Sequence, residues 1–316
     1  MNNPHDKFFK SLFSRKQEVI EFVKGAFPEK MLNKIDFDSF QIDPNSYVDK
    51  HLHEHFSDFV YNCHYGNRQI KIALLFEHKS TMPPYPHFQL LQYFVNIQEK
   101  QIKQNNRPVP VIPVVIYHGY KSWNYIPLDK YFTGIDKTIE KFLPQFDYLL
   151  IDLSKYSIDE VKHFYKSIAL QMSLLVLKYI FSKKELKSHF FRIFEKLPEL
   201  LKAYEGRDLY TSILAYLFYS SDLETTYVID NIQKISNKGG EIAMSTAEKL
   251  IQQGKQEGIH EGMQKGMQKG MQKGRQEGMQ KSKKEVAQRM IQEGFSDEVI
   301  ARITGLNQDE LIKLRG

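Results

Sequence analysis

The stretch SDFVYNCHYGNRQIKIALLFEHK (57–79) decides the fold. Both halves are rich in aromatic, β-branched and other apolar residues, which favour strands. Gly66-Asn67 divides them, and alternating residues around such a pair indicate a tight turn. The stretch therefore predicts a β-hairpin, two antiparallel strands joined at Gly66-Asn67.

Three charged residues come together on this hairpin. With the turn at its centre, Asp58 lies within a residue or two of the position opposite Glu77. Side chains alternate along a strand, so Glu77 and Lys79 share one face and His78 takes the other. Two carboxylates suit Mg²⁺, and a neighbouring lysine could position a water for attack on a phosphodiester. The same spacing is also typical of a solvated strand face with a weak ion pair, so both interpretations remain open.

The segments around the hairpin predict an α/β core. The pattern favours helices at 16–27 and 88–104 and buried strands at 111–118 and 148–153. The order is helix, strand, hairpin, helix, strand, strand. Three amphipathic segments then predict a helical subdomain: 158–182, 184–205 and 207–220.

The helix predicted at 88–104 also carries polar groups. The i, i+3, i+4 spacing brings Gln89, Gln92 and Tyr93 to one face. These side chains could hydrogen-bond a phosphate or the attacking water, so we count them as candidates for the same site.

Composition limits the class of protein. The 316 residues are 41% hydrophobic and 13% aromatic, which excludes a disordered chain. The formal net charge of +6 is compatible with a nucleic-acid partner. One cysteine, Cys63, excludes an internal disulfide framework and fits a reducing cytoplasm. No signal peptide is evident and no apolar run approaches the roughly 18 residues of a membrane span, so we expect a cytoplasmic protein without a membrane partner.

Seven glycines recur every fourth residue from Gly254 to Gly278, within the near-repeat GMQK. On a helix this spacing gives a slowly rotating stripe along which two backbones could approach closely. Glycine also lowers helix stability, so a mobile tether is the competing interpretation. We expect a homo-oligomer formed through this repeat and the C-terminal region.

The last residues predict a small helix-turn-helix-like unit. Gly294 closes its first helix, Ser296 suits an N-cap, and Asn307 with Glu310 resembles a capping box. Acidic residues open the last helix and would repel phosphate, so the pattern favours a protein or oligomer contact over DNA reading.

Other groups have both functional and structural interpretations. A histidine cluster could hold a transition metal, although an exposed, polar strand start explains it better: His51, His53, His55 and His64. Cys63 has little support as a nucleophile. His118 fits either a satisfied turn residue or the rim of a cleft. Three aromatic residues could stack on a base or fill the core: Tyr120, Trp123 and Tyr125.

Several motifs, in this order, resemble one family: HDKFFK (5–10), SYVDKHLHEHFSDFVY (46–61), LLFEHKS (74–80), FQLLQYF (88–94) and VVIYHG (114–119). It is the Rpn family of recombination-promoting nucleases, also described as YhgA-like transposases of the PD-(D/E)XK type. The resemblance implies a restriction-endonuclease-like core, a mixed sheet flanked by helices. It also implies DNA cleavage that depends on Mg²⁺, or on Mn²⁺ or Ca²⁺.

The resemblance also assigns roles to residues. Asp58 matches the aspartate of the motif, and Glu77 with Lys79 matches its (D/E)XK part. Asp58 and Glu77 are thereby implied as metal ligands, together with the backbone carbonyl of His78. Gln92 matches a supporting position on the following helix, and Asp6 is a weaker acidic candidate. Asp58 follows Ser57 where the general motif has proline.

We therefore expect a metal-dependent DNA endonuclease linked to recombination or transposition. A non-catalytic DNA-binding or regulatory oligomer with a relic site is the alternative. The expected organisation has four parts: a nuclease-like core (1–155), a helical subdomain (156–240), a glycine-repeat helix or linker (241–281) and the C-terminal unit (282–316).

Overall fold

The computed structural model describes residues 4–43, 57–77 and 85–315. Contacts divide the chain into two compact units, Met1–Glu248 and Lys249–Gly316. The expected nuclease-like core and helical subdomain both fall within the first unit. Among the described helices, none is both long and apolar enough to cross a membrane.

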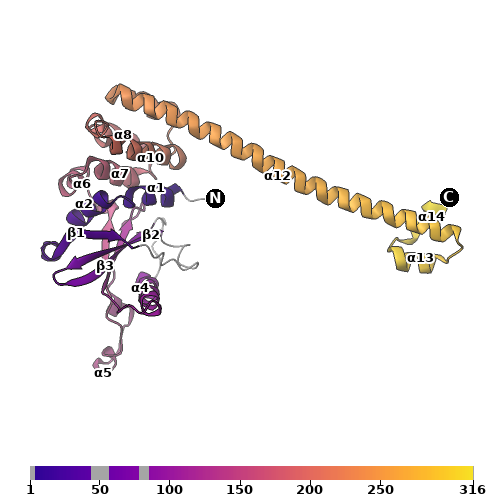
Figure 1. Cartoon of the computed structure of the whole chain (residues 1–316), viewed down its shortest axis with the longest axis horizontal. Helices are drawn as coiled ribbons and strands as arrows, with labels where there is room; N and C mark the ends of the chain where they lie inside the picture. The colour runs from indigo at the N-terminus through magenta and orange to yellow at the C-terminus, as the bar shows by residue number, and fades with distance from the viewer. Residues whose placement is uncertain (1–3, 44–56, 78–84, 316) are drawn as a thin grey trace. The chain divides into compact units, whose positions relative to one another are not determined.

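A mixed five-stranded sheet forms the centre of the first unit (Figure 1). Its strands lie side by side in chain order: β1 (Ile35–Ile42), β2 (Ser57–Tyr65), β3 (Arg68–Glu77), β4 (Val111–Tyr117) and β5 (Leu149–Asp152). The pairs β1–β2 and β2–β3 are antiparallel, whereas the pairs β3–β4 and β4–β5 are parallel. The α/β prediction is confirmed, and β1 is the strand expected before the hairpin.

The hairpin has the predicted turn. β2 and β3 pair without interruption from Ser57 opposite Phe76 to Tyr65 opposite Arg68. Gly66 takes a positive φ of 58°, which glycine adopts without steric cost. An intact register fixes which residues share a face, because a slip by one residue would reverse every side chain.

Helices cover one face of the sheet and bury most of the core. β2 and β3 contribute Tyr61, Cys63, Ile72 and Leu74 to this side. The helices of this core include α1 (Pro4–Phe13), α2 (Lys16–Ala26), α6 (Ile158–Phe164), α7 (Ile168–Tyr179), α8 (Lys183–Phe194) and α10 (Tyr204–Ser220), of which α8 and α10 pack on α7. Helix α7 is apolar almost all round, as expected for a helix packed between other helices.

Helix α4 (Pro86–Lys103) packs on the opposite face. Its Leu90, Tyr93 and Ile97 are buried at helical spacing. They share a second core with sheet residues that include Val115, and with Trp123 beyond β4. The remaining short elements of the first unit are α3 (Glu29–Leu32), η1 (Leu128–Tyr131), α5 (Lys137–Glu140), η2 (Leu153–Lys155), α9 (Leu197–Leu200) and α11 (Thr225–Ile235).

The helical part contains more breaks than its apolar spacing indicates. Segment 158–182 is two helices, α6 and α7, because Tyr165 is extended between them. Ser167 then caps α7 by accepting a hydrogen bond from the Leu170 backbone N–H. Segment 184–205 divides likewise, and Pro198 stands in the first turn of the new helix α9.

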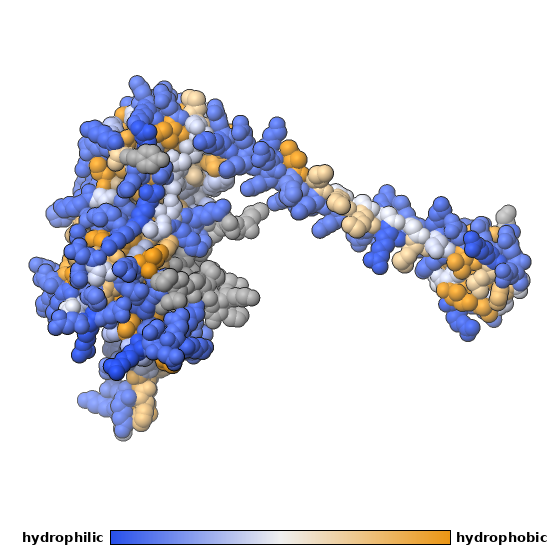
Figure 2. All heavy atoms as spheres, viewed as in Figure 1, coloured by the Kyte–Doolittle hydropathy of each residue, from blue (hydrophilic) through white to orange (hydrophobic). Residues whose placement is uncertain are grey.

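The glycine repeat lies within one continuous helix, α12 (Asn237–Gln292). Every residue from 251 to 282 is exposed, and Figure 2 shows lighter and orange residues interrupting the hydrophilic blue along α12. A Cβ added at any glycine from Gly254 to Gly278 would meet no atom within 4 Å. The helix interpretation is confirmed, whereas self-pairing stays a prediction.

Replacing Gly266 and Gly270 with alanine is expected to stabilise α12 by about 0.5–1 kcal/mol each, because alanine loses less conformational freedom in a helix. Thermal unfolding followed by circular dichroism measures this. Gly305→Ala is a control with the opposite expected effect. It should lower stability, because Gly305 has a φ of 67° and alanine there is strained. A loss of helical signal in the first variant would contradict the expectation.

The second unit ends in a small three-helix arrangement. The end of α12 packs against α13 (Asp297–Thr304) and α14 (Gln308–Arg315) around Ala287, Ile300, Leu306 and Leu311. Gly294 ends α12 with a φ of 83°. The capping box is confirmed, because the Asn307 and Glu310 side chains each accept a hydrogen bond of 2.9 Å from the other's backbone N–H. Ser296 holds the N-cap position of α13, but its side chain makes no capping hydrogen bond.

Candidate carboxylate site

Asp58 and Glu77 stand at one edge of the sheet, where β2 begins and β3 ends. Asp58 pairs with Leu75, and Glu77 is two residues beyond Leu75, so both occupy positions on the same face. Such diagonal positions on antiparallel neighbours are roughly 7–8 Å apart. Glu77 also pairs with Tyr117 of β4.

The register identifies the face. Val60 and Ala73 belong to the core beneath α4, and they have the same parity along their strands as Asp58 and Glu77. The two carboxylate positions are therefore on the side of the sheet that α4 covers. Lys79 and His78 lie outside the described residues.

The donor chemistry of this edge fits Mg²⁺. Carboxylates are the hard oxygen ligands that this ion takes, with waters completing its shell, and Asp58 and Glu77 are residues of this type at positions on one face. The other described side chains offer no competing centre, since no group of three or more His, Cys, Asp or Glu among them could hold a metal ion.

The three polar candidates on α4 differ in exposure. Tyr93 is buried in the core, and Gln92 is exposed. Gln89 is half-buried, and its Oε1 has no hydrogen-bond partner among the described residues. The role of Gln92 in supporting the site stays a prediction. Asp6 pairs with Lys10 at 3.0 Å on α1, whose Phe9 packs on the other face of the sheet.

The histidine cluster and the cysteine are only partly described. His51, His53 and His55 lie outside the described residues, and His64 is exposed, with Nδ1 3.9 Å from Asp36 Oδ2. Cys63 is buried, and burial raises the pKa of its thiol to about 12, with a smaller contribution from Asp36. A thiol so rarely ionised is a poor nucleophile, which agrees with the low expectation for Cys63.

Trp123 belongs to the core. Only 1% of it is exposed, and its ring packs edge-on against Tyr117 with centroids 5.1 Å apart. The base-stacking interpretation is therefore wrong for Trp123, because a base cannot reach the ring. Tyr120 is 71% exposed, and the hydroxyl of Tyr125 donates to Asp147 at 2.6 Å.

His118 is also buried rather than at the rim of a cleft. Its Nδ1 lies 3.2 Å from the carbonyl oxygen of Leu177 in α7, and its ring stacks on Phe181 with centroids 5.1 Å apart. The interpretation of His118 as a structural residue is confirmed, and the cleft-rim interpretation is wrong.

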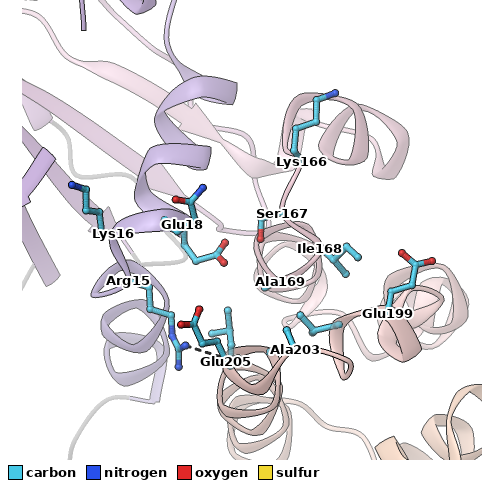
Figure 3. Close-up of a pocket in the computed structure, with 14 residues that line it drawn as sticks. Arg15, Lys16, Glu18, Lys166, Ser167, Ile168, Ala169, Glu199, Ala203 and Glu205 are labelled. Atoms are coloured by element: carbon cyan, nitrogen blue, oxygen red, sulfur yellow. Dashed lines mark hydrogen bonds between the residues drawn. The ribbon is translucent and has the colours of Figure 1, made fainter. Parts of the chain in front are cut away.

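A pocket of about 720 Å³ lies where α2, α7 and α10 begin, on the side of the sheet opposite α4 (Figure 3). Its lining joins residues far apart in the chain, so no local pattern predicts it. Arg15 donates to the carbonyl oxygen of Glu205 at 3.4 Å. Burial raises the pKa of Glu18 above its ordinary value of 4.5, and a hydrogen bond with Ser167 partly opposes this.

Glu18→Gln is expected to change how stability depends on pH. The folded chain holds the Glu18 proton more tightly than the unfolded chain does. This contribution is complete below pH 4.5 and is lost as the pH rises through the folded pKa. The free energy of unfolding of the wild type should thus fall relative to Glu18→Gln from pH 4.5 upwards, measured by denaturant unfolding. Parallel curves would refute this, and Glu199→Gln, an exposed residue of the same pocket, is the control.

Comparisons with known proteins agree with the fold and the motifs. The family of YhgA-like transposases matches residues 3–208, and the C-terminal helix-turn-helix domain of the Rpn/YhgA-like nuclease family matches residues 280–316. No solved structure matches the chain.

Three curated relatives carry related names. Recombination-promoting nuclease RpnA of Escherichia coli K12 is 23% identical over 316 residues, 98% of this chain and 96% of the relative. Inactive recombination-promoting nuclease-like protein RpnE of the same strain is 23% identical over 98% of this chain and 97% of the relative. Recombination-promoting nuclease RpnD of Escherichia coli O157:H7 is 27% identical over 51% of this chain and 62% of the relative.

Proposed function

The chain belongs to the YhgA-like transposase family, and from this premise we propose that it is a metal-dependent endonuclease that hydrolyses DNA phosphodiester bonds in recombination or transposition. One observation carries the proposal: the unbroken register of β2 and β3 gives Asp58 and Glu77 positions on the same face at the sheet edge. Lys79 follows two residues after Glu77, as the nuclease motif requires.

In this proposal the residues have different roles. Asp58, Glu77 and the backbone carbonyl of His78 hold the ion. Mg²⁺, or Mn²⁺ or Ca²⁺ in its place, would offset the charge that develops on the phosphate. Lys79 orients the attacking water, and Gln92 supports the site from α4. Each group acts by position and charge, since phosphodiester hydrolysis needs little else from the protein.

The C-terminal unit would hold the chain on DNA or join it to other copies. Its match to a helix-turn-helix domain supports DNA binding. The acidic start of α14 favours a protein contact, and Arg315 there pairs with Asp297 at 2.6 Å. We retain self-association through α12 and this unit as part of the proposal.

A second candidate function is a non-catalytic DNA-binding or regulatory oligomer. It is favoured by RpnE, which is named inactive and matches this chain over as much of its length as RpnA does. This sequence has a lysine at position 79, as in the (D/E)XK motif that it resembles, and that supports retained activity.

Incubation of the purified chain with supercoiled, linear and single-stranded DNA distinguishes the two. Nicked or shortened products in Mg²⁺, absent with EDTA, are expected from a nuclease. DNA binding without cleavage in Mg²⁺, Mn²⁺ or Ca²⁺ would instead establish the second candidate. A matched RNA substrate tests whether the chain distinguishes DNA from RNA.

A further inference from the structure

Four aromatic rings form a partly exposed cluster where α4 begins and η1 ends. Tyr85 is 55% exposed and Phe88 is 43% exposed, and Tyr131 and Phe132 are half-buried beside them. Each ring contacts at least one other, with centroids 5.3–6.2 Å apart. We call these four residues the aromatic platform.

The platform lies on the same side of the sheet as the carboxylate positions, because His87 packs on Tyr148 of the core that α4 shares with the sheet. A continuous path of ring contacts, with centroids 4.9–6.4 Å apart, leads from Tyr117, the register partner of Glu77, to the platform: Tyr117, Trp123, Tyr148, His87, Tyr131 and Tyr85.

His87 connects the platform to the core. It is completely buried, and its Nδ1 lies 3.1 Å from the hydroxyl of Tyr131. Its ring also packs against Tyr125 and Tyr148, with centroids 5.8 and 4.9 Å away. The exposed rings are therefore attached to a packed core, and they lose little freedom when a ligand stacks on them.

The beginning of α4 adds positive electrostatic potential at the platform. Among the described residues no side chain caps this 18-residue helix, and its first turn holds no acidic residue. Pro86 has no N–H, and the Phe88 N–H donates to the Tyr85 carbonyl oxygen at 3.3 Å. The His87 N–H is therefore the donor left in this turn among the described hydrogen bonds. The N-terminal end of a helix attracts phosphate through its dipole. Nε2 of His87 and Oε1 of Gln89 are buried atoms without a hydrogen-bond partner among the described residues.

We propose that the aromatic platform and the N-terminal end of α4 form a subsite for an unpaired nucleotide of the DNA substrate, on the same side of the sheet as the carboxylate positions. The bases stack on Tyr85, Phe88 and Tyr131, and the phosphate lies at the helix end. This inference rests on the proposed nuclease function and adds to it a substrate class, DNA with unpaired bases.

Stacking explains why the substrate must be unpaired. The faces of paired bases are covered by their neighbours in a duplex, whereas bases of a single strand are free to stack on side chains. Stacking depends little on base identity, so the subsite favours strand openings, gaps and single strands over a particular sequence.

Binding of fluorescent DNA to the full chain in EDTA tests this without cleavage. The probes are a mixed-sequence single strand and the matching duplex. The variant Tyr85→Ala/Phe88→Ala removes the two most exposed rings, and Tyr85→Phe keeps a ring. The control is Phe191→Ala/Tyr219→Ala, which removes two exposed rings from α8 and α10, beyond the other face of the sheet.

The wild type should bind the single strand more tightly than the duplex. The platform variant should lose about tenfold or more in single-strand affinity, while Tyr85→Phe and the control stay near the wild type. Equal single-strand affinity in the platform variant and the control would overturn the subsite. Thermal unfolding of each variant shows whether a loss of affinity comes from unfolding.

The same measurements separate this inference from the proposed function. If the chain cleaves no DNA in any metal but the platform variant still loses single-strand binding, the nuclease proposal fails and the subsite stands. If cleavage is observed and single-strand binding is unchanged in the platform variant, the subsite alone is overturned.

Discussion

Replacing Asp58 with alanine is expected to lower the rate of Mg²⁺-dependent DNA nicking at least about a hundredfold, because one of two carboxylates proposed to hold the ion is lost. Glu77→Ala should have an effect of similar size for the same reason. Initial rates on supercoiled plasmid measure both. Asp38→Ala is the matched control, since Asp38 is an exposed aspartate on β1, away from this edge.

Lys79→Ala tests the proposed role of Lys79 in orienting the attacking water. Without the ammonium group the water is no longer oriented, so cleavage should fall to the level of Asp58→Ala even at high Mg²⁺. A loss that extra Mg²⁺ restores would instead assign Lys79 to ion binding. Unchanged unfolding curves are expected for both variants, because Asp58 stands near the beginning of β2 rather than at its centre.

Trp123→Ala is expected to destabilise the first unit by about 3–5 kcal/mol. The indole is buried between Tyr117 and Tyr148, and neighbouring side chains can close only part of the cavity it would leave. Denaturant unfolding measures the change in free energy. Tyr120→Ala is the control, and it should change stability by less than about 0.5 kcal/mol because its ring is exposed.

The opposite result would change the assignment of Trp123. If Trp123→Ala left stability unchanged and weakened DNA binding, the indole would have to be accessible to a base. The backbone N–H of Trp123 also donates to Asp152 Oδ2 at 2.7 Å, which ties the loop after β4 to β5. That bond survives the substitution, so the expected loss reports on the indole side chain.

The hairpin could be predicted because its information is local. Gly66-Asn67 specifies the turn, and the turn fixes the register that puts Asp58 and Glu77 on one face. The capping box of Asn307 and Glu310 was predictable for the same reason, since both partners lie within one helical turn.

Features that depend on residues far apart in the chain could not be predicted from the sequence in this way. Trp123 is buried because β5 and α4 meet it in space, and nothing beside it in the chain shows this. The pocket around Glu18 needs three helix ends, and Tyr165 interrupts a helical pattern to stack on Phe22, with centroids 5.8 Å apart. In each case tertiary packing overrides the local preference.

The glycine repeat could be predicted from the sequence only in part. Its period predicted either a helix or a tether, and α12 is a helix. The reason for glycine at Gly254, Gly266 or Gly278 is not found in this chain, because none of them has an atom near its missing Cβ. Close approach of a second copy would supply that reason, as the proposed self-association requires.

The most direct measurement compares wild-type and Asp58→Ala protein on supercoiled plasmid, with Mg²⁺ and with EDTA. The wild type should convert the plasmid to nicked and linear forms only in Mg²⁺, and the variant should convert none in the same time. Equal cleavage by both proteins would contradict the assignment of Asp58. No cleavage by the wild type in any divalent metal, with DNA binding retained, would contradict the nuclease itself.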